Sequence, residues 1–287
     1  MEHQLFRAIV AVLATLDKRP KGKCTYSDER IAQVYYWAVI HDRPNTWACR
    51  RENWPPHLRR PLPSDSRLSR RLRSPSVVAL LAALERRVTA PAGPGLFWVI
   101  DGKPLPIGGS SKDRQAGYGR AAGGKAKGYK VHAIIGTSGI AAWRVAPMNK
   151  DERVMAARLL RGAGIQGYLV GDTNYDSNPL HAVCDQLGEL QLIARRRRGG
   201  AMGHHRHSAG RLRSVERTEN PFPAFADQLL RDRAAIERAF GNWVNWGGGL
   251  TALPAWVRTH RRVHRWVQAK LVLAAIKRPR EIPTCAA

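Results

Sequence analysis

The chain has 287 residues, of which 44% are hydrophobic, so it can bury a core in one large domain or two small ones. Its formal net charge is +26, from 48 Lys and Arg against 22 Asp and Glu. That surplus is more than an enzyme with a neutral substrate needs. The phosphate backbone of nucleic acid is the commonest partner of such a surface. An anionic membrane and ribosome-like or chromatin-like packing are the alternatives.

The cysteines and the apolar stretches indicate a cellular compartment. The 4 cysteines are scattered and form no C-x-x-C pair, which disfavours a zinc knuckle or a disulfide framework and fits a reducing cytosol. The stretch LFRAIVAVLATL contains an arginine and is followed by no cleavage site, so it is predicted to be an amphipathic core helix. No stretch approaches the ~18 apolar residues of a membrane span. We therefore expect a cytoplasmic, nucleoid-associated protein with no membrane partner.

Residues 1–90 are predicted to form a small helical region that binds DNA. In SDERIAQVYYWAVIHD, Ser27 is expected to cap a helix whose first turn is acidic. Ser64 or Ser66 can cap a short basic helix, which Ser74-Pro75 ends and an apolar helix follows. This arrangement suits a helix-turn-helix-like reader, although a solvated basic face on an ordinary helical bundle fits equally well. The predicted DNA-contacting residues are Arg67, Arg70, Arg71 and Arg73.

A Pro/Gly-rich linker, TAPAGPG at 89–95, is the predicted domain boundary. After it, LFWVID, GYKVHAIIG and IAAWRVAPMN are expected to be three meandering strands. DERVMAARLLRGAG and SNPLHAVCDQLG then predict helices that alternate with the strands GYLVGD and LQLIAR. The order predicts an α/β fold over 95–280, in which helices flank a mixed sheet.

The last third of the chain is predicted to be loop and helix. Residues 195–220 are polar and are expected to form an exposed basic loop, while FADQLLRDRAAIERAFGNWVNW and RVHRWVQAKLVLAAIK predict helices. The second helix has an apolar stripe of Val263, Trp266, Val267, Leu271 and Ala274. Zinc binding by His204, His205 and His207 is disfavoured, because no cysteine is paired with them. The glycines of GGSSKDRQAGYGRAAGG lack the context of a nucleotide-binding loop and favour a basic hairpin or mobile loop that touches DNA.

Three carboxylates are candidates for chemistry. Asp101 follows FWVI and Asp172 follows YLVG, so both are expected at or just past the end of an apolar strand, where a charge is costly without a partner. Glu237 lies four residues after Arg233, at the edge of the buried face of its predicted helix. Together the three suit two Mg²⁺ ions ~4 Å apart. Taken singly they are a turn, a helix cap and a surface ion pair, and nothing in their spacing shows that they converge.

Three runs resemble the catalytic core of bacterial insertion-sequence transposases of the DDE type, in the group of insertion-sequence families four and five. They are VIDGKPLPIGGSSKDRQAGYGRAAGGKAKGYKVHAI, LVGDTNYDS and RDRAAIERAFGNW. The resemblance covers about 95–280 and implies a ribonuclease H-like fold. It implies that Asp101, Asp172 and Glu237 bind the metal and that Arg233 orients Glu237 or contacts phosphate. Mg²⁺ is the implied cofactor, with Mn²⁺ as a substitute.

The chain departs from the family pattern on the glutamate helix. Leu230 stands where the family often has Tyr, and Val244 stands where a Lys often follows the glutamate. Terminal-phosphate contacts would then fall to another base, such as Arg238 or Arg258, or the activity would be weakened.

Lys130 and His132 alternate along the strand GYKVH, so they share one face. They resemble the recurring Gly-Tyr-Lys-x-His of the family, which places them near the phosphates of bound DNA. Ordinary strand-surface residues fit this pattern as well.

The resemblance implies a transposase that binds double-stranded DNA at the terminal inverted repeats of its insertion sequence. Such an enzyme cleaves phosphodiester bonds with Mg²⁺ and joins the freed 3′-hydroxyl to target DNA. Because two ends are cut together, a homodimer or a higher synaptic assembly is expected. The alternatives are a nuclease of the same fold that cuts without joining, and a non-catalytic or degenerate DNA-binding descendant of a transposase, for which Val244 leaves room.

Overall fold

The computed structural model describes residues 1–16, 24–91, 93, 95–136, 139–196, 202, 206–219, 228–229, 231, 233 and 250–277. Their contacts divide the chain into two compact units. The first unit consists of Met1–Thr89 and the described residues from Arg265 onward, and the second consists of the described parts of Ala90–Asn242 and Leu250–His264. The stretch that begins at Arg265, which the sequence analysis assigned to the α/β region, therefore packs with the N-terminal helices.

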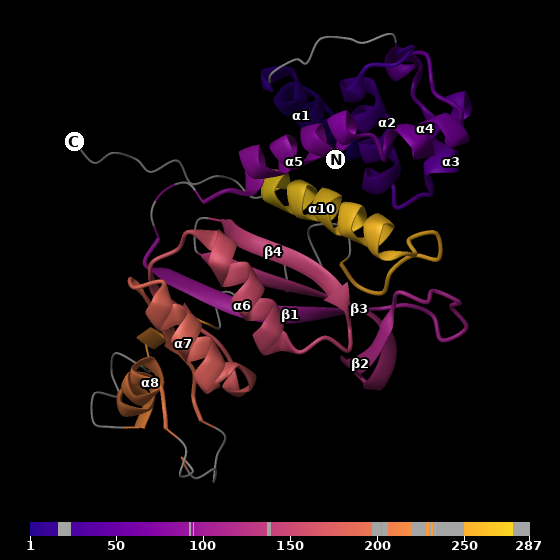
Figure 1. Ribbon diagram of the computed structural model, residues 1–287. Helices are drawn as coiled ribbons and strands as arrows, with labels where there is room; N and C mark the ends of the chain where they lie inside the picture. Colours follow the sequence, from indigo (N-terminus) through magenta and orange to yellow (C-terminus); the bar gives the residue numbers. More distant parts are fainter. Residues whose placement is uncertain are drawn as a thin grey trace, which may run out of the picture. The chain divides into compact units, whose positions relative to one another are not determined.

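The first unit is helical, and α2, α4 and α5 begin where the sequence predicts. It contains α1 (Glu2–Thr15), α2 (Asp28–Ile40), α3 (Asn45–Ala48), α4 (Asp65–Arg71), α5 (Pro75–Thr89) and the 3₁₀ helices η1 (Arg51–Asn53) and η2 (Pro56–Leu58) (Figure 1). The Ser27 hydroxyl accepts a 3.2 Å hydrogen bond from the Arg30 N–H and caps α2, as predicted. Of the two predicted caps for the basic helix, Ser64 is the one that acts, on the N–H of Arg67.

Aromatic and aliphatic side chains form the core of the first unit. Trp37 and Trp54 stack with their ring centroids 4.7 Å apart, and Phe6 meets both rings edge-on. Helix α10 (His260–Lys277) carries the apolar stripe predicted from the sequence, and all five of its residues are buried. Four of them, Trp266, Val267, Leu271 and Ala274, belong to the first unit, and Val263 belongs to the second. Lys270 on the same helix is also buried, and its ammonium group pairs with Asp42.

The second unit is built on a six-stranded mixed sheet. Its strands are β1 (Phe97–Pro106), β2 (Gly117–Ala121), β3 (Gly124–Gly136), β4 (Ile140–Pro147), β5 (Gly167–Val170) and β6 (Leu190–Ile193). The order is β2-β3-β1-β5-β6, and β4 also pairs with β3. The predicted meander of β1, β3 and β4 is antiparallel, whereas β5 pairs in parallel with both β1 and β6.

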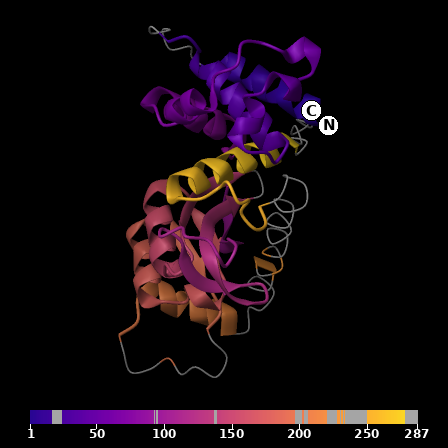
Figure 2. The ribbon, with the colours of Figure 1, turned by 90° about the vertical axis from the view of Figure 1, so that its right-hand side faces the viewer.

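Helices α6 (Glu152–Ala163) and α7 (Asn178–Gln186) connect the parallel strands. Both contribute to one apolar core, and α6 lies against a face of the sheet (Figure 2). Trp98 and Ile100 of β1 belong to this core, so the alternation of the strand places Val99 and Asp101 on the opposite face. Helix α8 (Ala209–Glu219) packs against α7 and β6.

The structure corrects two local predictions. β1 does not end at Asp101 but continues to Pro106, because its second half pairs with β3 over residues Lys103 to Pro106. The segment 195–220 is not a loop throughout, since the 11 residues Ala209–Glu219 form α8. Between the hairpin and the mobile loop that the glycine-rich run left open, the structure has a hairpin of β2 and β3.

The second unit has the α/β arrangement that the sequence predicted, a mixed sheet flanked by helices, and a helical N-terminal region precedes it in the chain. Within the described part of the chain, no helix combines the length and the apolar character needed to cross a membrane.

Candidate active site

Asp101 and Asp172 are neighbours across two strands. β1 and β5 pair in parallel with Val99 opposite Val170, and each carboxylate follows two residues later. Residues two apart on a strand share a face, so Asp101 lies on the side of Val99, beside the carboxyl end of β5. The register of two buried strands thus brings together two acids that are far apart in the sequence.

Asp172 also caps the turn that follows it. Its Oδ1 accepts a 2.8 Å hydrogen bond from the Asn174 N–H, and its Oδ2 accepts one of 3.2 Å from Asn174 Nδ2. These bonds begin the 3₁₀ helix η3 (Thr173–Tyr175). The capping role considered for Asp172 is therefore confirmed, and it leaves room for a metal because a carboxylate offers about four lone-pair sites.

The surroundings of Asp101 oppose its charge. Burial raises the pKa of Asp101 to about 6, although the Gly102 N–H, which donates a 2.7 Å hydrogen bond to Oδ1, acts in the opposite direction. The charge of Asp172 raises this pKa further, and the guanidinium of Arg233 lowers it. Asp172 and Arg233 therefore lie within electrostatic reach of Asp101. A cation at this position would relieve the repulsion between the two acids.

We expect Asp101→Asn to stabilise the metal-free protein at neutral pH. The folded state favours the protonated carboxyl of Asp101, whose pKa is ~4 in the unfolded chain and about 6 in the folded one. The wild type therefore loses stability as pH rises between these two values and loses no more above the folded pKa. The difference in the free energy of unfolding between Asp101→Asn and the wild type is expected to be about 2 kcal/mol at neutral pH. Urea unfolding of both forms in EDTA measures it at acidic and neutral pH. A gap that stays constant across this range would contradict the assignment.

Lys130 and His132 lie on the other face of the sheet. Lys130 Nζ pairs with Glu152, the first residue of α6. Gly102 makes room for this group, because a Cβ there would lie 2.9 Å from Lys130 Cδ and 3.4 Å from His132 Nδ1. His132 is buried, and burial, with a smaller effect of Lys130, lowers its pKa to about 4, so the ring is neutral. The two residues share one face, as predicted, but neither is a free surface cation.

Glu152 and Tyr175 are near the carboxylates and were not identified from the sequence. The Tyr175 side chain is buried, and burial raises its pKa well above the usual value. The charges of Glu152, Asp101 and Asp172 raise it further. A neutral phenol therefore lies beside the acids. Neither residue had a signal in the sequence, because Glu152 reads as an acid in the first turn of a helix and Tyr175 as an aromatic residue in a loop.

The remaining predicted DNA-contacting residues have different surroundings. Arg67, Arg70 and Arg73 are exposed on α4 or just past its end. Arg71 is half-buried and pairs with Asp28, which ties α4 to α2. Arg258 is half-buried, and its Nη1 donates hydrogen bonds of 2.6 and 2.9 Å to the carbonyls of Pro254 and Val257. The predictions for Glu237, Arg238, Leu230 and Val244 fall outside the described residues.

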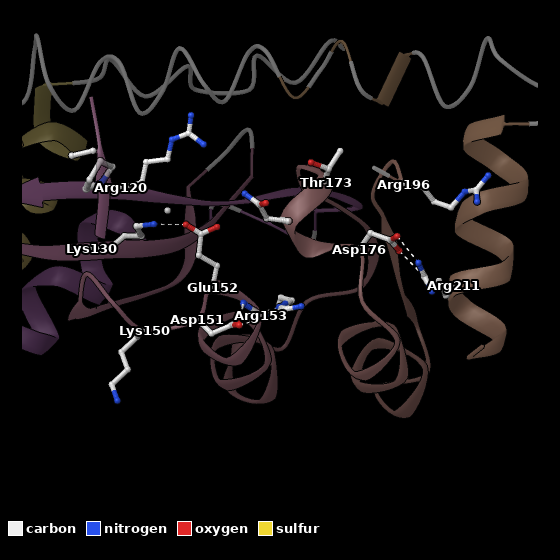
Figure 3. Close-up of a pocket in the computed structure, with 14 residues that line it drawn as sticks. Arg120, Lys130, Lys150, Asp151, Glu152, Arg153, Thr173, Asp176, Arg196 and Arg211 are labelled. Atoms are coloured by element: carbon white, nitrogen blue, oxygen red, sulfur yellow. Dashed lines mark hydrogen bonds and ion pairs between the residues drawn. The ribbon is translucent and has the colours of Figure 1, made fainter. Parts of the chain in front are cut away.

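A polar pocket of about 790 Å³ opens beside the loop that carries Asp172. Figure 3 shows Lys130 and Glu152 on one side of it and Asp176 with Arg211 on the other. It is lined by Gly102, Pro104, Arg120, Ala121, Lys130, Lys150, Asp151, Glu152, Arg153, Thr173, Asn174, Asp176, Arg196 and Arg211. Thr173 and Asn174 follow Asp172 directly, so the pocket lies beside the Asp172 loop, whereas Asp101 is not among its lining residues.

The side chains of Asp101 and Asp172 fit a hard divalent cation. Both are oxygen donors, and the raised pKa of Asp101, caused first by burial and then by the charge of Asp172, shows that the site opposes a second uncompensated negative charge. Within the described residues, no set of three His, Cys, Asp or Glu side chains is arranged to hold a metal.

A family model identifies the kind of domain. The family model described as "Transposase DDE domain" matches residues 93–271, well over half of the chain. Among solved structures, the chain resembles the cryo-EM structure of the piggyBac transposase synaptic complex with hairpin DNA, at 12% sequence identity and a TM-score of 0.36. The match covers 69% of this chain and 51% of that one, so the chain spans about half the length of this transposase. None of the curated proteins matches the chain.

Proposed function

From the premise that the chain belongs to the Transposase DDE domain family, we propose that it catalyses DNA transposition at the ends of an insertion sequence. It would bind the terminal inverted repeats, cleave phosphodiester bonds and transfer the freed 3′-hydroxyl to target DNA. The observation that carries the proposal is the parallel pairing of Val99 with Val170, which brings Asp101 and Asp172 together.

Asp101, Asp172 and Glu237 would hold Mg²⁺, or Mn²⁺ in its place. When bound, the metal supplies a Lewis acid and an activated water or 3′-hydroxyl for an in-line displacement. Arg233 would keep Asp101 ionised, because its guanidinium lowers the pKa of that carboxyl. The hydrogen bonds from Asn174 would hold Asp172 in place at the end of β5. The buried, neutral Tyr175 would exclude water from the protein side of the two carboxylates.

DNA would be held by basic residues of both units. Arg67, Arg70 and Arg73 are exposed and suited to phosphate contacts, and Arg71 would position α4 through Asp28. Lys130, beside neutral His132, would reach a phosphate by exchanging its Glu152 partner for it. Arg238 and Arg258 would replace the lysine that the family often has at the position of Val244. Cutting two ends together would need a homodimer or a larger synaptic complex.

The test is a cleavage and joining assay on labelled DNA that carries the flanks of the gene. We expect nicking at the repeat ends with joined products in Mg²⁺, and neither in EDTA or with Glu237→Gln. Glu216→Gln, which alters an exposed glutamate of α8, is the matched control and should remain active.

Two outcomes would replace the proposal. Normal cutting without joined products would make the protein a nuclease on the same fold. Tight DNA binding with no cutting by any form, indifferent to Mg²⁺, would leave a non-catalytic descendant, and Val244 would be the first position to examine.

A further inference from the structure

The hairpin of β2 and β3 carries a cluster of one aromatic and three basic residues. Tyr118 lies opposite Lys127 and Arg120 opposite Lys125, and the alternation of β2 exposes Tyr118 and Arg120 together. The ammonium groups of Lys125 and Lys127 each lie 6.0 Å from the centre of the Tyr118 ring. We call these four residues the hairpin cluster.

The backbone of the hairpin presents this cluster outward. Gly117 and Gly119 face Asn149 and Met148 so closely that a Cβ would lie 2.2 Å from Asn149 Oδ1 and 2.6 Å from the Met148 carbonyl. The two glycines therefore allow one face of β2 to pack closely against Met148 and Asn149. On the other face Tyr118 is 57% exposed, and a single exposed aromatic residue would mean little by itself. The lysines beside Tyr118 and the adjoining pocket indicate that it belongs to a binding surface.

The pocket beside the hairpin has a surplus of positive charge. Its three acids are each paired with a lining base: Glu152 with Lys130, Asp151 with Arg153 and Asp176 with Arg211. Arg196 pairs with Glu219, outside the pocket.

Arg120 and Lys150, both exposed, have no ion-pair partner among the residues that the structure describes. Figure 3 shows Arg120 and Lys150 at the pocket, and Arg120 belongs to the hairpin cluster as well, opposite Lys125, so positive charge continues from the pocket onto the hairpin.

We propose that the hairpin cluster and the pocket beside it bind an unpaired strand of DNA. A base would stack on Tyr118, and the phosphates on either side would contact Arg120, Lys125 and Lys150. Stacking requires a base whose flat face is free, which a closed duplex does not offer, whereas phosphate contacts alone would not need the tyrosine. The inference rests on the proposed function, because cleavage at Asp101 and Asp172 is what would release such a strand, and the loop that follows Asp172 lines the pocket.

The test compares affinities for a labelled single-stranded oligonucleotide and its duplex, measured by fluorescence anisotropy on the full chain. We expect Tyr118→Ala to weaken single-strand binding about tenfold and duplex binding less than twofold. Trp256→Ala is the control, because Trp256 is another exposed aromatic residue of the second unit, at 38%. Equal losses for the two DNA forms, or none for either, would overturn the proposal.

A second variant guards against a misfolded hairpin. Lys125→Gln, at an exposed position, should lower the slope of single-strand affinity against salt by about 0.7 and leave the thermal transition unchanged. An unchanged slope would also overturn the proposal. Failure here is distinct from failure of the proposed function. If Tyr118→Ala binds single strands normally while wild-type cleavage stays dependent on Mg²⁺, the hairpin assignment falls and transposition stands.

Discussion

Asp101→Asn is expected to abolish Mg²⁺-dependent cleavage while DNA binding persists. The change keeps the shape of the side chain and removes the charge of a proposed metal ligand from the middle of β1. Metal-assisted charge stabilisation is worth several kcal/mol, so the cleavage rate should fall about a thousandfold or more. Gel-based cleavage rates and binding isotherms, measured on the same preparation, separate the two properties.

The control for this variant is Asp185→Asn. Asp185 belongs to the same unit, lies on α7 and pairs with Arg213 at 2.7 Å, away from the carboxylates. It should cleave at close to the wild-type rate. Full activity of Asp101→Asn would remove Asp101 from the metal site, and a parallel loss of DNA binding would show that the change damaged the fold instead.

Asp176→Asn is expected to destabilise the protein by about 3 kcal/mol at neutral pH, because it breaks a largely buried ion pair. The Asp176 side chain is 6% exposed, and both of its oxygens accept hydrogen bonds of 2.8 Å from Arg211 of α8. His181 Nε2 lies 3.4 Å from Oδ1. Thermal or urea unfolding measures the loss. Since Asp176 closes the loop that begins at Asp172, cleavage should fall as well.

The stability difference between the wild type and Asp176→Asn depends on pH in a predictable direction. Burial would raise the pKa of Asp176, but the hydrogen bonds from His181 and Arg211 outweigh it and hold the pKa below the usual value. The contribution of Asp176 is then complete above ~4, the unfolded pKa, and is lost as pH falls toward the folded pKa. The gap should be constant from pH 7 to about 5 and close below about 4.

The matched control is Glu219→Gln. Glu219 pairs with Arg196, but its side chain is 41% exposed, so the loss should stay below ~1 kcal/mol. Equal losses for the two variants would show that the burial of Asp176 adds nothing.

The elements that the sequence predicted correctly have strong local signals. Ser27 and Asp151 cap α2 and α6, and Gly164 ends α6 in the left-handed conformation at φ 58°. Residues of this kind act on backbone groups within one turn, so their effect is visible without knowledge of the fold. The apolar stripe of α10 is equally local.

The elements that it missed depend on contacts distant in sequence. Helix α8 buries Gly210 and Ser214 and not a stripe of large apolar residues, so it has no hydrophobic periodicity to detect. The Ser214 hydroxyl accepts a 3.2 Å hydrogen bond from the Ala194 N–H, beyond the end of β6. β2 is rich in glycine, which disfavours strands, yet close packing against Met148 and Asn149 requires those glycines.

The candidate site also combines features with local sequence signals and features that depend on contacts distant in sequence. The sequence supplied Asp101 and Asp172 as candidates from the apolar strands that precede them, but only the β1–β5 register shows that they meet. The pairing of Lys130 with Glu152 could not be foreseen, because it depends on α6 starting next to β3. Glu237 stays a prediction from the family resemblance.

The register of β1 against β5 imposes a rule of parity on this chain. Insertion of one residue between Val99 and Asp101 would turn the carboxylate toward the core side of Trp98 and Ile100, and a second insertion would restore its side. The restored carboxylate would still be displaced by about 6.6 Å along the strand. An odd insertion is therefore excluded because it moves the carboxylate to the other face, and an even insertion because it displaces the carboxylate along the strand. β5, in contrast, ends at Val170, so Asp172 lies on a turn whose backbone can adjust. The position of Asp101 is therefore fixed by the pairing of the sheet, so any adjustment between the two carboxylates would fall to Asp172.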